Sequence, residues 1–216
     1  MNNTELELLK IIADMDSSVE GAFNIRANGA TAKRSVTENV DIVTKTDKNG
    51  IDIIIKPNTK GEKIHIPVII SETGLTELVY NDFIIGENAD VEIVAGCGIH
   101  NCGSEESRHD GIHSFFVGKN AKVKYTEKHF GSGDKGGERN MNPTTIINIA
   151  EGGYMEMDTT QIEGIDSTKR VTKARLSDNA TLIIKEKLMT HGSQYAETDF
   201  SVDLDGEYSG AHVVSR

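Results

Sequence analysis

One short motif recurs through the second half of the chain and restricts the folds that the chain can adopt. Each copy has a leading apolar residue, a bend of small residues, a small side chain and a new alternating strand, and the leading residues lie 32, 32, 27 and 28 positions apart. The copies are Ile85–Ile93, Val117–Tyr125, Ile149–Met157, Leu176–Ile184 and, more weakly, Leu204–His212. A bend that recurs once per coil lets every coil stack on the one before it, with paired strands about 4.8 Å apart and one face of each strand in a continuous core. The repeat therefore predicts a mainly β fold, a right-handed parallel β-helix.

The small residue after each bend supports this interpretation. Ala89, Ala121 and Ala180 occupy the same place in three copies, where a tight inward corner would have no room for a larger side chain. An antiparallel sandwich also has short alternating strands, but it need not repeat one corner motif at near-constant spacing. We therefore favour the β-helix over the sandwich.

The first part of the chain begins with a different period. Residues 4–15 carry apolar side chains at helical spacing (Leu8, Leu9, Ile11, Ile12 and Met15), with Asn3 or Thr4 as the expected N-cap. We assign residues 1–20 to an N-terminal helical segment and residues 21–216 to the β-helix core. The period-2 runs that follow are Phe23–Arg26, Val40–Val43, Ile51–Ile55 and Ile64–Val68, with Asn-Gly turns at 28–29 and 49–50. Pro67 within the last run predicts an edge strand or the mouth of a turn.

Composition and charge exclude several classes of protein. The 216 residues contain 21 Gly and only 3 Pro, which suits short strands joined by glycine turns, and the formal net charge of −11 argues against a nucleic-acid partner. No apolar run approaches the roughly 18 residues of a membrane helix, and the start lacks the pattern of a signal peptide. We therefore expect a cytoplasmic protein with reduced thiols and no membrane partner.

Both cysteines and three of the seven histidines fall within seventeen residues. They are Cys97, His100, Cys102, His109 and His113. Thiolate and imidazole are ligands of iron and zinc, so this stretch is a candidate metal or iron–sulfur site. The spacing matches no standard zinc finger, and the alternative is a small buried cysteine with histidines in turns.

The surroundings of Cys97 suggest where it lies and what it pairs with. The alternating run Val91–Ala95 predicts a strand that delivers Cys97 to a glycine-lined bend, where backbone N–H groups would favour the thiolate. His129 follows Cys97 by 32 residues, one repeat length, so the two are expected side by side on adjacent coils. The alternative for Glu127–His129 is a solvated, charged loop.

Two further polar stretches are weaker candidates for a functional site. The run Gly131–Gly137 lacks the order of a phosphate-binding loop and is interpreted as a flexible excursion from the solenoid. Glu163 and Asp166 are a carboxylate pair that could serve acid–base catalysis on a polysaccharide, or simply face solvent. There is no Gly-x-Ser-x-Gly motif.

Several of these runs together resemble the SufB/SufD family. The similar runs are Val94–Asn101, His109–His113, Tyr125–His129, Met155–Ile162 and Gly210–Arg216, within a resemblance that covers roughly residues 60–216. The chain looks most similar to the short, single-gene members. The resemblance implies a non-catalytic β-helix scaffold on which an iron–sulfur cluster of unknown type is transiently assembled. It also implies a SufC-type ATPase partner that docks on C-terminal helices, and a homodimer or SufB/SufD-type pair formed through the far end of the solenoid.

The resemblance also suggests roles for individual residues. Cys97 matches the cysteine of a family Gly-Cys-Thr-Ala-Pro stretch that receives or conducts sulfur, although Gly98–His100 here replaces Thr-Ala-Pro. Cys102 is expected as a second thiol. The possible ligands or tuning residues are His100, His109, His113 and His129. The family's later segment, with a further cysteine, a His-Glu pair and the docking helices, has no counterpart, so we expect that this chain is a fragment.

Two other functions remain open from the sequence. One is a β-helix carbohydrate-active enzyme that uses Glu163 and Asp166. The other is a structural interaction module in which the cysteines are core residues.

Overall fold

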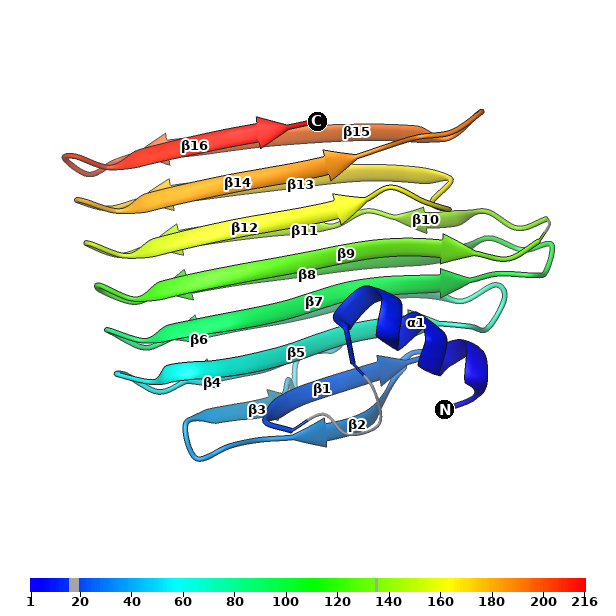
Figure 1. Cartoon of the computed structure of the whole chain (residues 1–216), viewed down its shortest axis with the longest axis horizontal. Coiled ribbons are helices and arrows are strands. Elements are labelled where there is room, and N and C mark those ends of the chain that lie inside the picture. Colours follow the sequence, from blue (N-terminus) through cyan, green and yellow to red (C-terminus); the bar gives the residue numbers. More distant parts are fainter. Residues whose placement is uncertain (16–19, 135) are drawn as a thin grey trace.

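Two sheets, A and B, face each other and together form the solenoid (Figure 1). The computed structural model describes residues 1–15, 20–134 and 136–216. Sheet A contains β1 (Ala22–Ala27), β2 (Ala30–Ser35), β5 (Lys60–Ile70), β7 (Asp90–His100), β9 (Lys122–Ser132), β12 (Tyr154–Gln161), β14 (Thr181–Leu188) and β16 (Gly210–Ser215). Sheet B contains β3 (Val40–Thr44), β4 (Gly50–Ile55), β6 (Thr76–Ile85), β8 (Ser107–Val117), β10 (Arg139–Met141), β11 (Thr144–Ile149), β13 (Ser167–Leu176) and β15 (Tyr195–Leu204).

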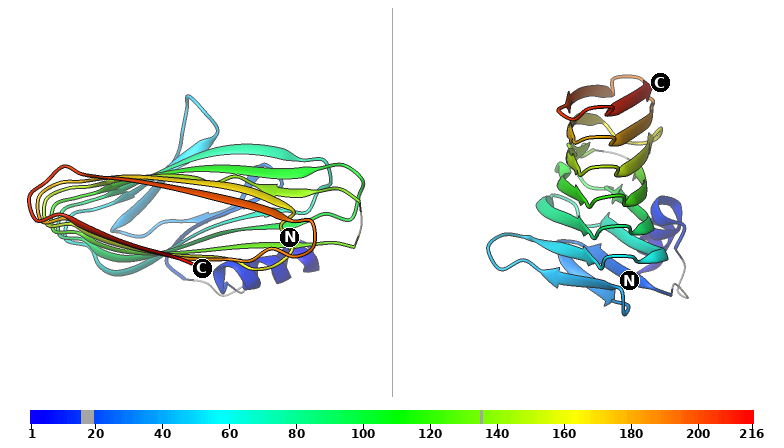
Figure 2. Two further views of the ribbon diagram at one scale, coloured as in Figure 1. Left: turned by 90° about the horizontal axis from the view of Figure 1, so that it is seen from above. Right: turned by 90° about the vertical axis from the view of Figure 1, so that its left-hand side faces the viewer.

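From β4 onward the chain alternates between the two sheets, except that the consecutive strands β10 and β11 both lie in sheet B. The strands pair in parallel with the equivalent strands of the next coil. In Figure 1 the front strands run to the right and the rear strands return to the left as the chain rises, so the coil is right-handed. Figure 2 shows the coils stacked on one another from the side. The predicted right-handed parallel β-helix is confirmed, and the parallel pairing excludes the antiparallel sandwich.

The recurring corner is formed by one backbone conformation and one backbone hydrogen bond. One residue of each corner has a positive φ, near 60°. In every corner but the last, its N–H donates to a carbonyl of the next corner, as Asn88 does to Lys119 O at 2.9 Å and Asn120 to Glu151 O at 3.0 Å. Asparagine and glycine tolerate this left-handed conformation better than other residues. The corner residues are Asn58, Asn88, Asn120, Gly152, Asn179 and Tyr208.

The inward small residue after the corner is also as predicted. Ala89, Ala121 and Ala180 are completely buried. Asn58 extends the repeat one coil earlier than the sequence indicated. This copy is hard to recognise because Lys56 and Thr59 stand where the copies at Asn88 and Asn120 have glycine and alanine.

The first strands depart from the parallel pattern. β1 and β2 pair antiparallel, as do β3 and β4, although β1 pairs in parallel with β5 and β4 with β6. The β1–β2 hairpin is closed by Asn28 and Gly29, with φ values of 47° and 82°, which is the type I′ geometry that an Asn-Gly pair favours. The Asn-Gly turn at 28–29 is thus confirmed, whereas in the second pair Gly50 is already the first residue of β4.

The expectation for Pro67 was wrong. It lies inside β5, a central strand of sheet A between β1 and β7. The β1–β5 ladder passes from the pair Phe23–His65 to the pair Arg26–Val68, and β1 is irregular between Ile25 and Arg26. The β1–β5 ladder thus skips Pro67, which has no N–H to donate to a neighbouring strand.

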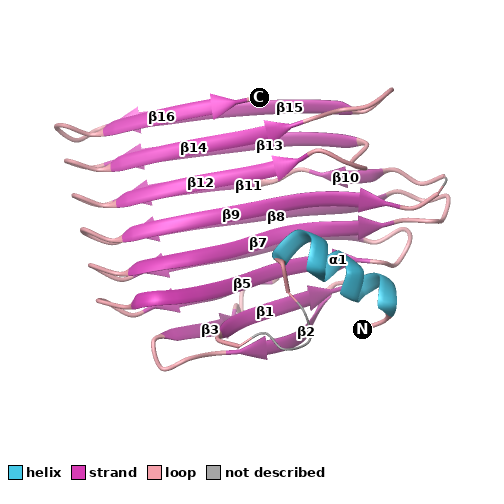
Figure 3. Cartoon of the chain, in the orientation of Figure 1, coloured by secondary structure: helices cyan, strands magenta, loops and turns pink. Residues whose placement is uncertain are grey.

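Helix α1 (Asn3–Ala13) packs on the outer face of sheet A (Figure 3). The N-cap is Asn2 rather than Asn3 or Thr4, because the Asn2 side chain accepts from the Glu5 N–H at 2.9 Å while the Glu5 carboxylate accepts from the Asn2 N–H at 2.8 Å. Leu8, Leu9, Ile12 and Met15 are buried as predicted, whereas Ile11 is 43% exposed. Residues 16–19, in the predicted N-terminal segment, lie outside the described residues. Among the described residues, no helix has the length and apolar content that crossing a membrane requires.

The corner geometry leads to a prediction for Asn120, which is exposed and has a φ of 54°. Replacing it with valine should lower the free energy of unfolding by about 1–2 kcal/mol, because a β-branched residue is strained in the left-handed region. Chemical denaturation monitored by circular dichroism measures the change. The control is Asn120→Gly, which should cost less than about 1 kcal/mol; equal losses in the two variants would contradict the argument.

Candidate functional site

Cys97 lies within strand β7, so the predicted bend at this position was wrong. β7 continues to His100, and the side chain of Cys97 points into the solenoid, where it packs with Val68, Ile99 and Met141. Only 2% of the residue is exposed. The strand alternation explains this orientation, because Ala95, Cys97 and Ile99 share the inner face of the sheet.

The glycines on either side of Cys97 make room for the helix. A Cβ at Gly96 would lie 2.8 Å from the Ile12 carbonyl oxygen and 2.6 Å from that of Lys128, and a Cβ at Gly98 would lie 3.1 Å from Leu8 Cδ2. Real side chains essentially never reach the first two distances. The glycines therefore let α1 lie flat on β7 and cover it from outside.

The predicted neighbour of Cys97 is confirmed. Cys97 pairs with His129 in the β7–β9 register and with Val68 in the β5–β7 register. The same row continues to Arg26 on β1 and to Gln161 on β12. The repeat length of 32 thus places the thiol and the imidazole side by side on the inner face of sheet A.

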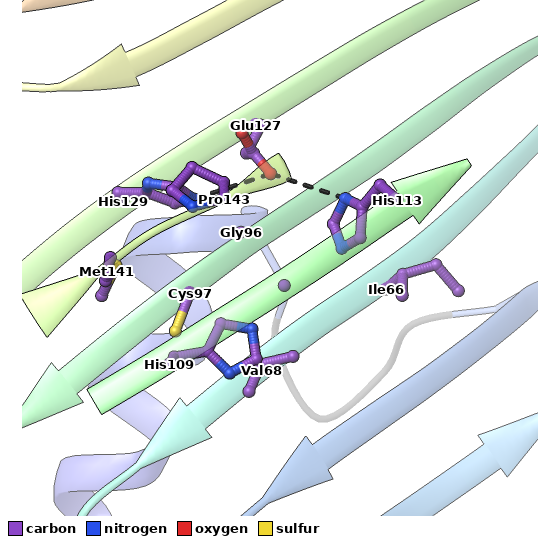
Figure 4. Close-up of a pocket in the computed structure, with 11 residues that line it drawn as sticks. Ile66, Val68, Gly96, Cys97, His109, His113, Glu127, His129, Met141 and Pro143 are labelled. Carbon is purple, nitrogen blue, oxygen red and sulfur yellow. Dashed lines mark ion pairs between the residues drawn. The ribbon is translucent and has the colours of Figure 1, made fainter. Parts of the chain in front are cut away.

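Sheet B supplies the opposite wall. His109 and His113 point inward from β8, with Gly111 between them, and face Cys97 and His129 around one small internal cavity of about 10 Å³ (Figure 4). A volume of this size corresponds to about one water molecule. A Cβ at Gly111 would approach both imidazoles at 3.2–3.4 Å. Four of the six predicted site residues therefore meet in the interior: Cys97, His109, His113 and His129.

A buried carboxylate, Glu127, connects three of the surrounding groups. Its Oε1 accepts from the Tyr125 hydroxyl at 2.9 Å and lies 3.5 Å from His129 Nε2, and its Oε2 lies 3.1 Å from the guanidinium of Arg170. The Tyr125 hydroxyl in turn lies 2.9 Å from His113 Nδ1. Arg170 continues the network to Glu186 at 3.1 Å.

A second buried carboxylate, Glu77, lies on β6, the strand that precedes Cys97 along the chain. Glu77 on β6 pairs with Arg26, and its Oε2 lies 3.4 Å from His109 Nδ1. Within the described part of the chain, neither Glu77 Oε2 nor His109 Nδ1 makes a hydrogen bond of good geometry. Two polar atoms that are buried and unsatisfied next to a thiol are unusual in a folded interior.

The sequence analysis missed Glu77, Arg26 and Arg170, and it offered a solvated loop as an alternative for Glu127. The available signal was the period-2 alternation of β9, which puts Tyr125, Glu127 and His129 on the same face. Since the apolar Val123 and Tyr125 face inward, Glu127, two residues later, is expected to face inward as well. The same alternation places Glu77 on the inner face of β6 with Val79, and Arg170 on the inner face of β13 with Ala174. Which groups face them depends on the coils that stack above and below.

Burial and neighbouring charges shift the pKa values of the ionisable side chains inside the solenoid. Burial, together with the negative charges of Glu77 and Glu127, raises the pKa of the Cys97 thiol well above its usual value. The predicted activation of this thiol as a thiolate was therefore wrong for the closed interior. Burial alone would raise the pKa of Glu127, but the histidines and Arg170 lower it well below its usual range. Burial lowers the pKa of His113 to about 4, against the opposing effect of Glu127.

The remaining two predicted residues lie elsewhere. His100 ends β7, and Cys102 follows it in an exposed loop, with Sγ 3.1 Å from His100 Nε2. This pair is separate from the interior cluster. No group of three histidine, cysteine, aspartate or glutamate residues within the described ranges is arranged to hold a metal ion.

The two other polar stretches, which include Asp166 and the glycine run after β9, also lie in folded parts of the structure. The Asp166 carboxylate accepts hydrogen bonds from the Arg139 guanidinium at 2.8 and 3.2 Å, so an ion pair already engages it. The glycine run after β9 packs against the loop that contains Cys102, and the Gly137 N–H donates to the Gly103 carbonyl at 2.6 Å. Its described residues are thus part of the folded edge rather than a free excursion; residue 135 lies outside the described residues.

Two curated proteins are similar in sequence to this chain. An iron–sulfur cluster assembly SufBD family protein of Archaeoglobus fulgidus is 29% identical over 173 residues, which cover 79% of this chain and 44% of that protein. Another, of Methanocaldococcus jannaschii, is 24% identical over 166 residues, which cover 76% of this chain and 51% of that protein. The resemblance to the SufBD family is confirmed. This chain therefore spans about half the length of the SufBD relatives it matches, and no family model matches it.

Because His113 is buried and neutral, we predict that the fold loses stability in acid. Its folded pKa lies below its unfolded value of 6.5, so the unfolded chain binds more protons and stability falls as pH drops from about 6.5 to about 4. The contribution reaches about 3 kcal/mol at the acid end of this window. The measurement is the free energy of unfolding against pH.

The His113→Gln variant should show a shallower slope in that window, whatever its stability at pH 7. The exposed His191→Gln variant serves as the control and should keep the wild-type slope. If His113→Gln and wild type lose stability in parallel, His113 does not titrate as described.

Proposed function

We propose that this chain is a non-catalytic scaffold for iron–sulfur cluster assembly, and that Cys97 receives sulfur or iron inside the solenoid. The observation that carries the proposal is the convergence of Cys97, His109, His113 and His129 on one interior cavity. The printed names of the two relatives, which describe iron–sulfur cluster assembly, support the same process.

The chemistry of the donor set suits this cargo. A thiol, imidazoles and the carboxylate of Glu77 are ligand types that iron accepts, and Glu77 Oε2 and His109 Nδ1 have no hydrogen bond to lose within the described structure. Iron binding displaces the thiol proton, so a raised Cys97 pKa makes loading release a proton and favours it at higher pH. The side chains must shift to coordinate an ion, which suits transient rather than permanent holding.

The partners of the proposed scaffold follow from the resemblance. We propose that it works with a SufC-type ATPase and pairs with a second copy or a SufB/SufD-type chain through the far end of the solenoid. Size-exclusion chromatography with light scattering and co-purification with the ATPase test these two associations.

Cys97→Ala should abolish sulfur or iron loading in anaerobic reconstitution with ferrous iron and inorganic sulfide, because it removes the interior thiol. The readouts are bound iron and sulfide together with the visible absorption of the cluster. Circular dichroism should show an unchanged fold, since the alanine loses only one buried sulfur. Normal reconstitution by this variant would refute the assignment.

Cys102→Ala is the matched control, since it removes the other thiol at an exposed site. With inorganic sulfide as the sulfur source it should reconstitute as wild type does. Thiol titration of the native protein adds a second check. Cys102 should react at once and Cys97 slowly; slow reaction of Cys97 combined with normal loading of Cys97→Ala would instead support the structural module with core cysteines.

A further inference from the structure

A row of exposed apolar side chains crosses the outer face of sheet B. Ile54, Ile84 and Phe116 are paired in register on β4, β6 and β8, and they are 37%, 40% and 46% exposed. The next residues along two of these strands, Ile85 and Val117, belong to the core, so alternation directs the row outward. Contiguous exposed apolar side chains on a folded protein mark an interaction surface.

The outer face of sheet A is different, because its exposed part is charged. One row there, in register on β5, β7, β9 and β12, consists of Lys63, Glu92, Lys124 and Glu156. Lys63 and Lys124 each place Nζ 3.7 Å from the Glu92 carboxylate. Charged residues of this kind suit a sheet face that meets water. The apolar row of sheet B therefore needs a different explanation from solvent exposure.

Helix α1 shows what kind of element packs across such a row. It contacts β5, β7 and β9 and covers an outward row with one residue from each of four neighbouring strands: Ala27, Ile69, Gly98 and Phe130. Adjacent strands lie about 4.8 Å apart and a helix rises about 5.4 Å per turn, so successive turns of a crossing helix meet successive strands. The row of sheet B has the same arrangement, on the side of the solenoid opposite α1 (Figure 2).

The row continues into a surface groove toward the later coils. The groove has a volume of about 430 Å³, and its lining includes Ile84, Phe116, Asn148 and Arg175. Asn148 pairs with Phe116 in the β8–β11 register, and Arg175 pairs with Asn148 in the β11–β13 register. Arg175 Nε lies 2.9 Å from Asp205, so its charge is already balanced. The groove thus has an apolar floor and a neutral polar end.

The opposite end of the row has an excess of negative charge. Asp41 on β3 pairs with Ile54 in the ladder, and Asp52 and Asp82 lie two residues before Ile54 and Ile84 on the same face. Lys45 forms ion pairs with both Asp52 and Asp82, whereas Asp41 has none among the described residues. The hairpin that carries Lys45 projects from this side of the solenoid (Figure 2). A partner with basic residues beside its apolar side chains complements this end.

We propose that the row formed by Ile54, Ile84 and Phe116 is the docking surface for an amphipathic helix of another protein, with lysine or arginine beside its apolar side. The apolar side chains of that helix pack on the row and enter the groove, which is helix-in-groove recognition. Its basic residues pair with Asp41 and with the carboxylates that share Lys45. This surface lies outside the solenoid, so the inference does not depend on the interior loading site.

The test uses a fluorescein-labelled peptide of leucine and lysine, arranged as an amphipathic helix of about 14 residues, roughly four turns. A counterpart peptide has glutamate in place of lysine. Fluorescence anisotropy measures the Kd of each peptide for the whole chain. Wild type should bind the lysine peptide at least about tenfold more tightly than the glutamate peptide, because the carboxylates at the end of the row attract one and repel the other.

Substitutions at exposed positions locate the binding surface. Phe116→Lys should weaken binding of the lysine peptide at least about tenfold, because it removes an apolar contact and adds a like charge. The matched control Ile162→Lys, at an isoleucine that follows β12 in sheet A and is 50% exposed, should keep the Kd within about twofold.

Charge alone is tested in the same assay. Asp41→Lys should weaken binding of the lysine peptide about threefold or more, since it removes the unpaired carboxylate beside the row. Glu7→Lys, on the exposed side of α1, makes the same change in net charge and should have a smaller effect. Circular dichroism should show the native fold for all four variants, because each position is exposed.

Equal affinity for the two peptides, or a loss of affinity in Ile162→Lys that equals or exceeds the loss in Phe116→Lys, would overturn the inference. A second copy of the chain is the competing occupant. If light scattering shows wild type as a dimer and Phe116→Lys as a monomer, the row is a self-association surface and the proposal is wrong. Pairing through the far end of the solenoid predicts instead that Phe116→Lys leaves the oligomeric state unchanged.

The proposed function is judged by a separate readout. Phe116→Lys should load iron and inorganic sulfide as wild type does, because Phe116 points away from the interior that contains Cys97. Failure of the peptide test therefore leaves the loading site intact, and normal loading of Cys97→Ala leaves the docking surface intact.

Discussion

Stacking of one backbone corner on the next is the constraint on which the other features depend. A left-handed residue in each coil donates to the following corner, and this ladder keeps successive strands in parallel register. With the register fixed, residues one repeat apart become neighbours, such as Cys97 and His129. The site is therefore a consequence of the repeat length: an insertion of one residue in the coil would turn inward side chains outward.

The interior contains two chemically different regions. Near the corners, the core is apolar and includes the stacked rings of Phe83 and Phe115. Farther along the same strands it becomes ionic, with Glu127 and Arg170 at its centre. A buried ion pair costs desolvation that apolar side chains of the same size would avoid, so it is weak evidence for stability. Its position around a thiol and a cavity supports the proposed role of the interior in receiving sulfur or iron.

Two thiols five residues apart experience opposite environments because a strand ends between them. Cys97 lies inside β7 with α1 packed over its neighbouring glycines, and burial keeps it protonated. Cys102 lies beyond the end of β7, in a loop braced by Asn101 and in contact with His100. The end of β7 therefore separates an exposed thiol from a buried thiol within one short segment.

The sequence by itself determined the coil, its corners and the pairing of Cys97 with His129, since these depend on a repeat that can be counted along the chain. It also identified the candidate ligand residues, although it treated them as one cluster. Only the tertiary structure separated His100 and Cys102 from the interior four, because the end of β7 cannot be read from glycines that serve to accommodate α1. Likewise, Glu77 and Arg170 join the site through coils stacked on either side of Cys97, and no local pattern records which distant strands will face each other.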